Sequence, residues 1–127
     1  MNGIAGLRRT LGERHPDIVN VLRGLSTLRE RQGRHADAER IARESLALAE
    51  SVLGADHVNT ATSHQRLALA LMAQKRYADA ETHLLRARAI REQRFGPTGA
   101  LTQQIVASLV TLYTAWGKVE KAAALKK

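Results

Sequence analysis

The sequence predicts an all-α fold in which pairs of helices stack into a solenoid, and three observations support this prediction. The segment 32–39, Gln-Gly-Arg-His-Ala-Asp-Ala-Glu, returns 42 residues later at 74–81 as Gln-Lys-Arg-Tyr-Ala-Asp-Ala-Glu. Gly12, Gly54 and Gly96 keep the same spacing of 42. An internal repeat of this length is typical of stacked supersecondary units, and the alternation with period two that marks a strand persists nowhere in the chain.

The composition favours closely packed helices. Hydrophobic residues make up 44% of the 127 residues, but aromatic residues only 3%, so the core must consist of Ala, Leu, Ile and Val. Short aliphatic side chains let neighbouring helices approach each other closely. We therefore expect a single repeat domain over residues 1–127.

The first expected element, in residues 1–11, is the end of a helix from a preceding repeat. Its apolar residues are spaced by three and four: Ile4, Leu7 and Leu11. Gly12 then suits a C-terminal cap, because glycine adopts the left-handed conformation without steric cost. Pro16 suits the first turn of the next helix.

Repeat 1 is expected to span 12–53 and to contain two helices. The first runs to about Gln32 and is broken by Gly33, and the second runs from about His35 to Leu53. The apolar stripe expected on the first helix is Ile18, Leu22, Leu25 and Leu28. The residues expected to be buried in the second are Ala38, Ile41, Ala42, Ser45, Ala49 and Val52.

Repeat 2 is expected to span 54–95, with Asp56 as the N-cap because its carboxylate can accept from the unpaired N–H groups of the first turn. Its helices are expected at about 57–74 and 77–95. The residues expected to be buried in them are Ala61, His64, Leu67, Ala68, Leu71, Ala80, Leu84, Ala87 and either Ile90 or the stem of Arg91. A partial repeat 3 is expected over 96–127. Its apolar residues are Leu101, Ile105, Leu109 and Leu112.

Two sets of motifs recur in register. Leu-Gly-Glu-Arg-His-Pro at 11–16 and Gly-Arg-His-Ala-Asp-Ala-Glu at 33–39 form one set; Leu-Gly-Ala-Asp-His at 53–57, Leu-Ala at 67–68 and Arg-Tyr-Ala-Asp-Ala-Glu at 76–81 form the next. With these motifs the chain resembles the tetratricopeptide repeat family, in the 42-residue form found in kinesin light chains and many bacterial repeat proteins. The resemblance implies a right-handed α-solenoid of stacked helix–turn–helix repeats. It also implies a non-enzymatic scaffold that binds a peptide or protein partner in a concave groove.

The resemblance further implies that the first helix of each repeat lines the groove. Spacings of three, seven and ten place polar residues on one side of each of these helices. The candidate peptide-binding residues are Asn20, Arg23, Thr27 and Arg31 in repeat 1, Thr62, Gln65, Arg66, Leu69 and Met72 in repeat 2, and Gln104 and Thr111 in repeat 3. Leu69 and Met72 are apolar on a face that the fold does not need to bury. They suggest a groove for a peptide with a hydrophobic anchor and acidic neighbours, or else packing against a further repeat or a second chain.

The chain departs from its relatives at the carboxylate clamp by which chaperone-binding members hold a C-terminus. The clamp would require Asn at Thr27 and Arg66, and Lys at Gln104. Only Arg23 is compatible with it. The sequence therefore argues against docking of a chaperone C-terminus.

A net charge of +8, with 20 Lys and Arg against 12 Asp and Glu, favours anionic partners, although solvated helix faces explain it equally well. Several arginines crowd the second helices and suggest a polyanion-binding ridge: Arg40, Arg43, Arg86, Arg88, Arg91 and Arg94. Nucleic acid is an unlikely ligand on sequence grounds, because the few aromatic residues form no platform for stacking bases.

Other functions find little support in the sequence. There is no cysteine, the histidines lack carboxylates at ligand spacing, and no nucleophile triad, HExxH motif or phosphate loop is present. We therefore expect no enzyme activity, no metal and no cofactor. The sequence also lacks a membrane span and an apolar signal, so we expect a cytoplasmic protein.

The ends of the array suggest an alternative function. A repeat buries its apolar face only against neighbours, and both ends carry apolar residues: Ile4, Leu7 and Leu11 at one end, and Val119, Ala122 and Leu125 at the other. The chain could therefore be a regulatory or oligomerisation segment of a larger signalling protein that associates with itself end to end or as a dimer.

Overall fold

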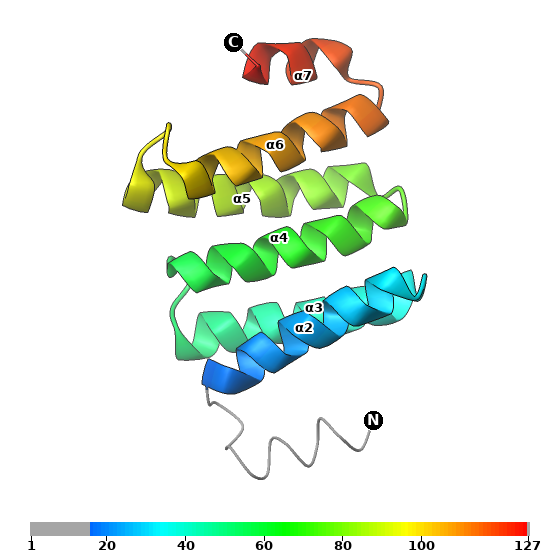
Figure 1. The fold of residues 1–127 in the computed structure, drawn as a ribbon, viewed down its shortest axis with the longest axis vertical. Helices are drawn as coiled ribbons and strands as arrows, with labels where there is room; N and C mark the ends of the chain where they lie inside the picture. Colours follow the sequence, from blue (N-terminus) through cyan, green and yellow to red (C-terminus); the bar gives the residue numbers. More distant parts are fainter. Residues whose placement is uncertain (1–15, 127) are drawn as a thin grey trace.

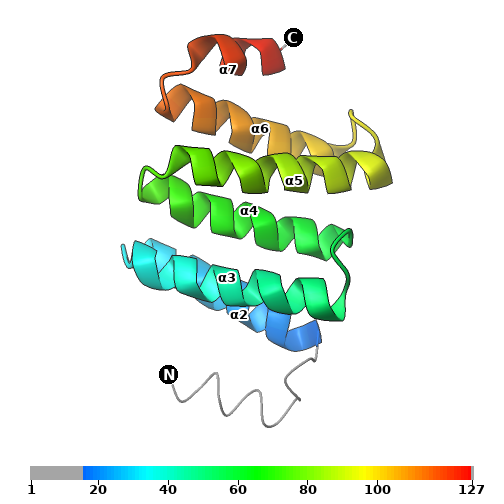
Figure 2. The ribbon, with the colours of Figure 1, turned by 180° about the vertical axis from the view of Figure 1, so that it is seen from behind.

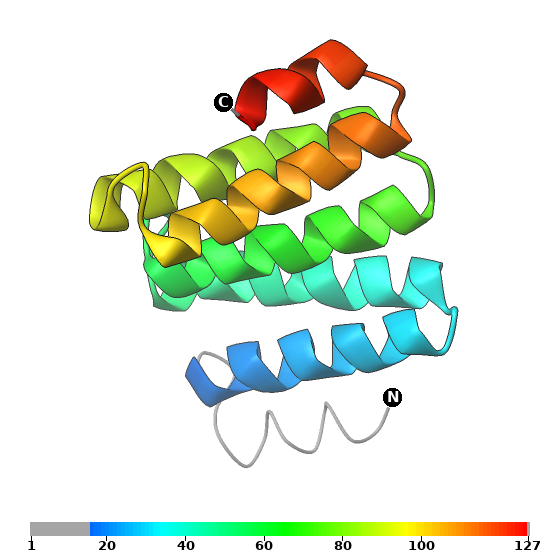
Figure 3. The ribbon, with the colours of Figure 1, turned by 45° about the horizontal axis from the view of Figure 1, so that its top comes forward.

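The computed structural model describes residues 16–126, and this part of the chain consists of helices joined by turns, with no strand. The helices are α2 (Pro16–Arg31), α3 (His35–Val52), α4 (Val58–Ala73), α5 (Tyr77–Phe95), α6 (Ala100–Ala115) and α7 (Val119–Leu125). Short turns reverse the chain after each helix, and the helices stack in order from α2 to α7 (Figure 3). The prediction of an all-α solenoid of helix–turn–helix repeats is confirmed.

The helices lie in two layers. Figure 1 shows α2, α4 and α6 in front, and Figure 2, from behind, shows α3 and α5 in front. The short helix α7 packs against α6 at the end of the stack. The first helix of each pair therefore shares a layer with the first helices of the other pairs, which is the arrangement that the candidate site requires.

The turn inside each helix pair needs a residue in the left-handed conformation. Gly33 has φ of 75° in the α2–α3 turn and Gly117 has φ of 79° in the α6–α7 turn. The equivalent position in the α4–α5 turn is Lys75, with φ of 62°, the only residue other than glycine with positive φ in the described part of the chain. A side chain with a Cβ is strained in this conformation, so the α4–α5 turn holds backbone strain that the other two avoid.

The main hydrophobic core runs continuously from α3 to α7. A smaller cluster, formed by Ile18, Leu22 and Ile41, joins α2 to α3. Ala38, Ala80 and Ala122 occupy the same place in successive helix pairs and are 0%, 0% and 5% exposed. A larger side chain at these positions would push the paired helices apart.

Most of the expected core residues are buried, but four are not. Leu28 is 46% exposed and Leu101 is 39% exposed, and Leu25 and Val52 are only half-buried. At 3.6 residues per turn, Leu28 lies about 120° around the helix from Leu22, so it leaves the packing side. Val19 and Ser26 fill that side instead.

The N-cap of α4 also differs from the prediction. His57, not Asp56, caps the helix, because its Nδ1 accepts from the N–H of Asn59 at 3.0 Å. Asp56 instead forms an ion pair with Arg86 of α5. A histidine Nδ1 acts here as the side-chain acceptor that Asp or Ser usually provides.

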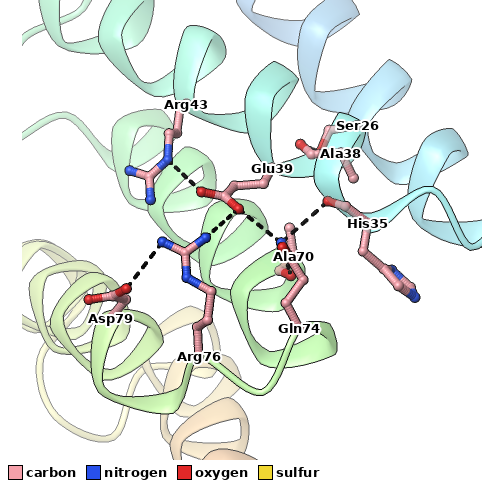
Figure 4. A network of polar contacts seen from close by, with 9 residues as sticks. All are labelled: Ser26, His35, Ala38, Glu39, Arg43, Ala70, Gln74, Arg76 and Asp79. Atoms are coloured by element: carbon pink, nitrogen blue, oxygen red, sulfur yellow. Dashed lines mark hydrogen bonds and ion pairs between the residues drawn. The ribbon is translucent and has the colours of Figure 1, made fainter.

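A carboxylate links successive helix pairs through polar contacts (Figure 4). Glu39 of α3 accepts from Arg76 Nη1 at 2.6 Å, from Gln74 Nε2 at 2.9 Å and from Arg43 Nε at 2.8 Å. Burial alone would raise the pKa of Glu39, but the hydrogen bonds from Arg43, Gln74 and Arg76 outweigh it and lower that pKa. The contacts of Glu39 therefore fasten α3 to the turn between α4 and α5. Glu81, 42 residues later, accepts from the hydroxyl of Tyr113 at 2.6 Å and joins α5 to α6.

The apolar ends of the array behave only partly as expected. Val119 is 70% exposed, but Ala122 is buried and Leu125 packs against the main core. The expectation that all three form an open end surface is therefore wrong for the last two, because α7 turns them toward α6. Ile4, Leu7, Leu11 and Gly12 lie outside the described residues.

Candidate binding face of α2, α4 and α6

The first-helix face is the surface formed by α2, α4 and α6. Arg23 of α2 donates from Nη1 to the backbone oxygen of Asn59 in α4 at 3.2 Å. Gln65 of α4 donates from Nε2 to the hydroxyl of Ser108 in α6 at 3.3 Å. Hydrogen bonds therefore join each helix of this face to the next, in the front layer of Figure 1.

All of the candidate peptide-binding residues lie on these three helices. Asn20, Arg31, Gln104 and Thr111 are exposed, and the half-buried ones are Arg23, Thr27, Thr62, Gln65, Arg66, Leu69 and Met72. The hydroxyls of Thr27 and Thr111 donate to backbone carbonyls four residues earlier in their own helices, both at 3.1 Å. These two threonines therefore have one hydrogen-bonding group less to offer a ligand.

The expected apolar floor is smaller than the sequence suggests. Met72 packs against the main core, because it follows the fully buried Ala68 by four residues and so shares its side of α4. Leu69 lines a pocket together with Ser26, Thr27, Glu30 and Arg66. The pocket measures about 40 Å³, far below the ~150 Å³ of a cavity that holds benzene. Of the two residues of the expected floor, Leu69 is the one that does not pack against the main core.

Arg91 belongs to this face, although it comes from α5. Its Nη2 donates to the hydroxyl of Thr62 at 2.9 Å, and its Nη1 donates to the backbone oxygen of Leu101 at 3.0 Å and toward Gln104 Oε1 at 3.5 Å. Only 4% of the residue is exposed. Burial, and then the positive charge of Arg23, lower the pKa of Arg91.

The prediction that Arg91 belongs to an exposed ridge of arginines is wrong, because its side chain is buried. Its spacing of four from Ala87 and seven from Leu84 puts it on the buried side of α5. That spacing was the signal in the sequence, and it explains why the guanidinium reaches between α4 and α6 rather than outward.

Comparison with known protein families identifies the architecture. Family models described as tetratricopeptide repeat match residues 4–51, 28–71 and 60–98, which together span more than half of the chain. The chain belongs to the tetratricopeptide repeat family. Such repeats generally mediate protein–protein interactions and generally serve as non-catalytic scaffolds. No curated protein matches the sequence.

Outside its first-helix face, this tetratricopeptide array largely neutralises its arginines. Arg86 pairs with Asp56, Arg88 with Glu92 at 2.9 Å, Arg43 with Glu39 at 2.8 Å and Arg40 with Asp37 at 3.6 Å. Exposed pairs of this kind stabilise little, but they cancel the charge that a polyanion would need. The expected ridge therefore offers far less free positive charge than its sequence implies.

Two histidines meet inside the array, between α4 and α5. His64 and His83 bring their Nδ1 atoms to 3.0 Å of each other. Burial, the positive charge of His83 and that of Arg86 lower the pKa of His64 to about 4, and burial and Arg43 lower the pKa of His83. Both rings are therefore neutral at pH 7, and one donates to the other.

The part of the chain with described coordinates holds no cluster of three metal-ligating side chains. Over the same residues, no helix combines the length and the apolar character needed to cross a membrane. His64 and His83 make a polar contact between α4 and α5.

Proposed function

We propose that this tetratricopeptide array is a non-enzymatic scaffold that binds a peptide or protein segment along its first-helix face. The units of the scaffold are the predicted repeats, 12–53 and 54–95, followed by a partial repeat over 96–127. The observation that carries the proposal is the contrast between the two layers: most of the outer arginines are paired with carboxylates, whereas the first-helix face presents half-buried polar and cationic groups.

The geometry of the face supports this function. The bridges from Arg23 to Asn59 and from Gln65 to Ser108 hold neighbouring helices in register, so a ligand that spans all three helices meets a surface that is already ordered. Preorganisation of this kind lowers the entropy lost on binding. Leu69 supplies an apolar contact at the centre of the face.

A matched pair of substitutions tests the proposal. Leu69→Glu places a charge on the first-helix face, and Leu85→Glu makes the same change on α5, where Leu85 is 44% exposed. Peptides selected from a random phage-displayed library against the unaltered protein should lose about tenfold or more in affinity with Leu69→Glu, equivalent to about 1.4 kcal/mol. Leu85→Glu should bind them nearly as well as the unaltered protein.

Equal loss of affinity in both variants, or loss with Leu85→Glu alone, would place the ligand elsewhere. Circular dichroism and thermal unfolding of both variants establish that they are folded. The comparison is fair because both leucines lie on helices of the same array and receive the same change of charge.

Self-association is the second candidate function, and one observation favours it. Val119 begins α7, and with 70% exposed it is the most exposed of the large apolar side chains in the described part of the chain. If α7 docks against a second copy, Val119→Lys should shift a concentration-dependent sedimentation profile to that of a monomer. A monomeric unaltered protein at high concentration would exclude this candidate.

A further inference from the structure

Three arginine side chains converge on the first half of α4. Arg23 approaches from α2 and contacts the backbone oxygen of Asn59, and Arg91 approaches from α5 and contacts Thr62 one turn later. Arg66 follows Thr62 by four residues. Residues three and four apart lie on the same side of a helix, so Asn59, Thr62 and Arg66 bring the three guanidinium groups to one stretch of the first-helix face.

Neutral groups, not carboxylates, hold two of these guanidinium groups. Arg23 contacts Asn20 Oδ1 as well as Asn59, and Arg91 contacts Thr62, Leu101 and Gln104. Within residues 16–126, no ion pair joins a carboxylate to any of the three. The ion pairs of this part of the chain involve other basic residues: Arg34, His35, Arg40, Arg43, Arg76, Arg86, Arg88 and Lys121.

The positive charges act on one another. Burial and then the charge of Arg66 lower the pKa of Arg23, and burial and then the charge of Arg23 lower the pKa of Arg91. A like charge nearby disfavours the charged form of a group, and an opposite charge favours it. An anion at this position would therefore relieve a repulsion that the folded chain leaves uncompensated.

Glu30 and Asp56 form ion pairs with residues other than these three arginines. Glu30 of α2 lines the same small pocket as Arg66, but its Oε1 contacts the ring of His35 and its Oε2 has no hydrogen-bond partner. Asp56, before α4, pairs with Arg86 on the other layer. Arg23, Arg66 and Arg91 thus form a group of neighbouring positive charges without a carboxylate partner, whereas four arginines of the other layer are paired with acids: Arg40, Arg43, Arg86 and Arg88.

We propose that Arg23, Arg66 and Arg91 form a binding site for the carboxylate side chain of an acidic peptide segment. This proposal rests on the proposed function and specifies the chemistry of the partner. Arg23 and Arg66 are half-exposed and offer N–H groups in the planar arrangement that matches a carboxylate. Arg91 is buried and contributes its charge from beneath, while its hydrogen bonds position Thr62 and Gln104.

A peptide carboxylate fits the face better than a phosphate chain does. The positive charge is confined to one stretch of α4, whereas a nucleic acid needs a longer basic track with stacking aromatics. Tyr77, Tyr113 and Trp116 pack together near the α4–α5 and α6–α7 turns, away from the first half of α4. The ligand that this charge recognises is therefore short and acidic.

Arg66→Gln is the decisive variant. Gln removes the charge, and the structure gives the Arg66 side chain no hydrogen bond whose loss would disturb the fold. Arg40→Gln is the matched control, because it removes the same charge from α3, where the Arg40 side chain is 58% exposed. The probe is fluorescein-labelled hexaglutamate with an amidated C-terminus, and its binding is followed by fluorescence anisotropy at low salt.

The expected result is specific. The unaltered protein binds the probe, Arg66→Gln weakens binding about tenfold, which is typical for the loss of one charged hydrogen-bonding partner, and Arg40→Gln changes it less than about twofold. Arg66→Lys keeps the charge and should restore part of the affinity. Equal weakening by Arg66→Gln and Arg40→Gln would overturn the proposal, because it would show attraction to net charge alone.

Further probes identify the source of the anion. Hexaglutamine with a free C-terminal carboxylate should bind weakly, and stronger binding of this peptide than of hexaglutamate would overturn the choice of a side-chain carboxylate. Displacement of the probe by inorganic phosphate at far lower concentration than by glutarate would overturn it in favour of phosphate. If the selected peptides are neutral, bind the first-helix face and keep their affinity with Arg66→Gln, the proposed function is supported but the carboxylate site is refuted.

Discussion

The buried histidine pair makes the stability of the array depend on pH. His64 is 6% exposed and contacts His83 at 3.0 Å, and its pKa in the folded protein is about 4 rather than the usual 6.5. Between these two values the unfolded chain binds a proton at this position that the folded chain does not. The free energy of unfolding therefore falls as the pH drops below 6.5, and the loss is complete near pH 4.

The size of the effect follows from the two pKa values. Linkage gives a loss of about 2 kcal/mol from His64 between pH 7 and pH 5. This is a sizeable share of the ~5–15 kcal/mol that stabilises a typical domain. The lowered pKa of His83 acts in the same direction.

Urea unfolding provides the assay, with the fluorescence of Trp116, the single tryptophan of the chain, as the signal. The free energy of unfolding is measured at pH 7 and pH 5 for the unaltered protein and for His64→Gln. The difference between their pH dependences reports His64 together with any change that its loss causes in the pKa of His83, which contacts it. Between pH 7 and pH 5, we expect the free energy of unfolding of His64→Gln to fall by about 2 kcal/mol less than that of the unaltered protein. Identical slopes would refute the reasoning.

Three further predictions concern stability and use the same unfolding assay. Lys75→Gly should stabilise the array by about 0.5–1 kcal/mol, because relief of the left-handed strain exceeds the greater freedom of glycine in the unfolded chain; a destabilised variant would contradict the assigned turn. Glu39→Gln should cost about 1–2 kcal/mol, since it weakens the bonds to Arg43 and Arg76, whereas the exposed Glu50→Gln should change little. Ala80→Leu should cost about 2–3 kcal/mol by overpacking, and an unchanged stability would show that the helix pair has room to spare.

The helical architecture could be predicted because the repeat supplies the same local signals more than once. Gly33 and Gly96 mark helix ends with positive φ, and Ala38 and Ala80 mark the closest helix contacts. Each signal acts within a few residues of its own position, so the sequence displays it directly. The ends of α3 and α5 accordingly fall within a residue of the expected positions.

The side chains of the candidate face were harder to predict. The helix that carries Arg91 belongs to the other layer, and only the packing of α5 against α4 and α6 brings its guanidinium to Thr62 and Leu101. Met72 is half-buried because part of its side chain packs against the main core. Spacing within α5 and α4 shows on which side of its helix each residue lies, but the groups that it contacts on the neighbouring helices cannot be read from a single helix's periodicity.

The central claim is that a ligand binds across α2, α4 and α6, and an NMR titration tests it most directly. A peptide selected for binding is added to the ¹⁵N-labelled protein, and the amide shifts are followed residue by residue. We predict that the largest changes fall on residues of the first-helix face, above all Arg23, Gln65 and Arg66. Changes concentrated on α3 and α5, or around Val119, would contradict the claim.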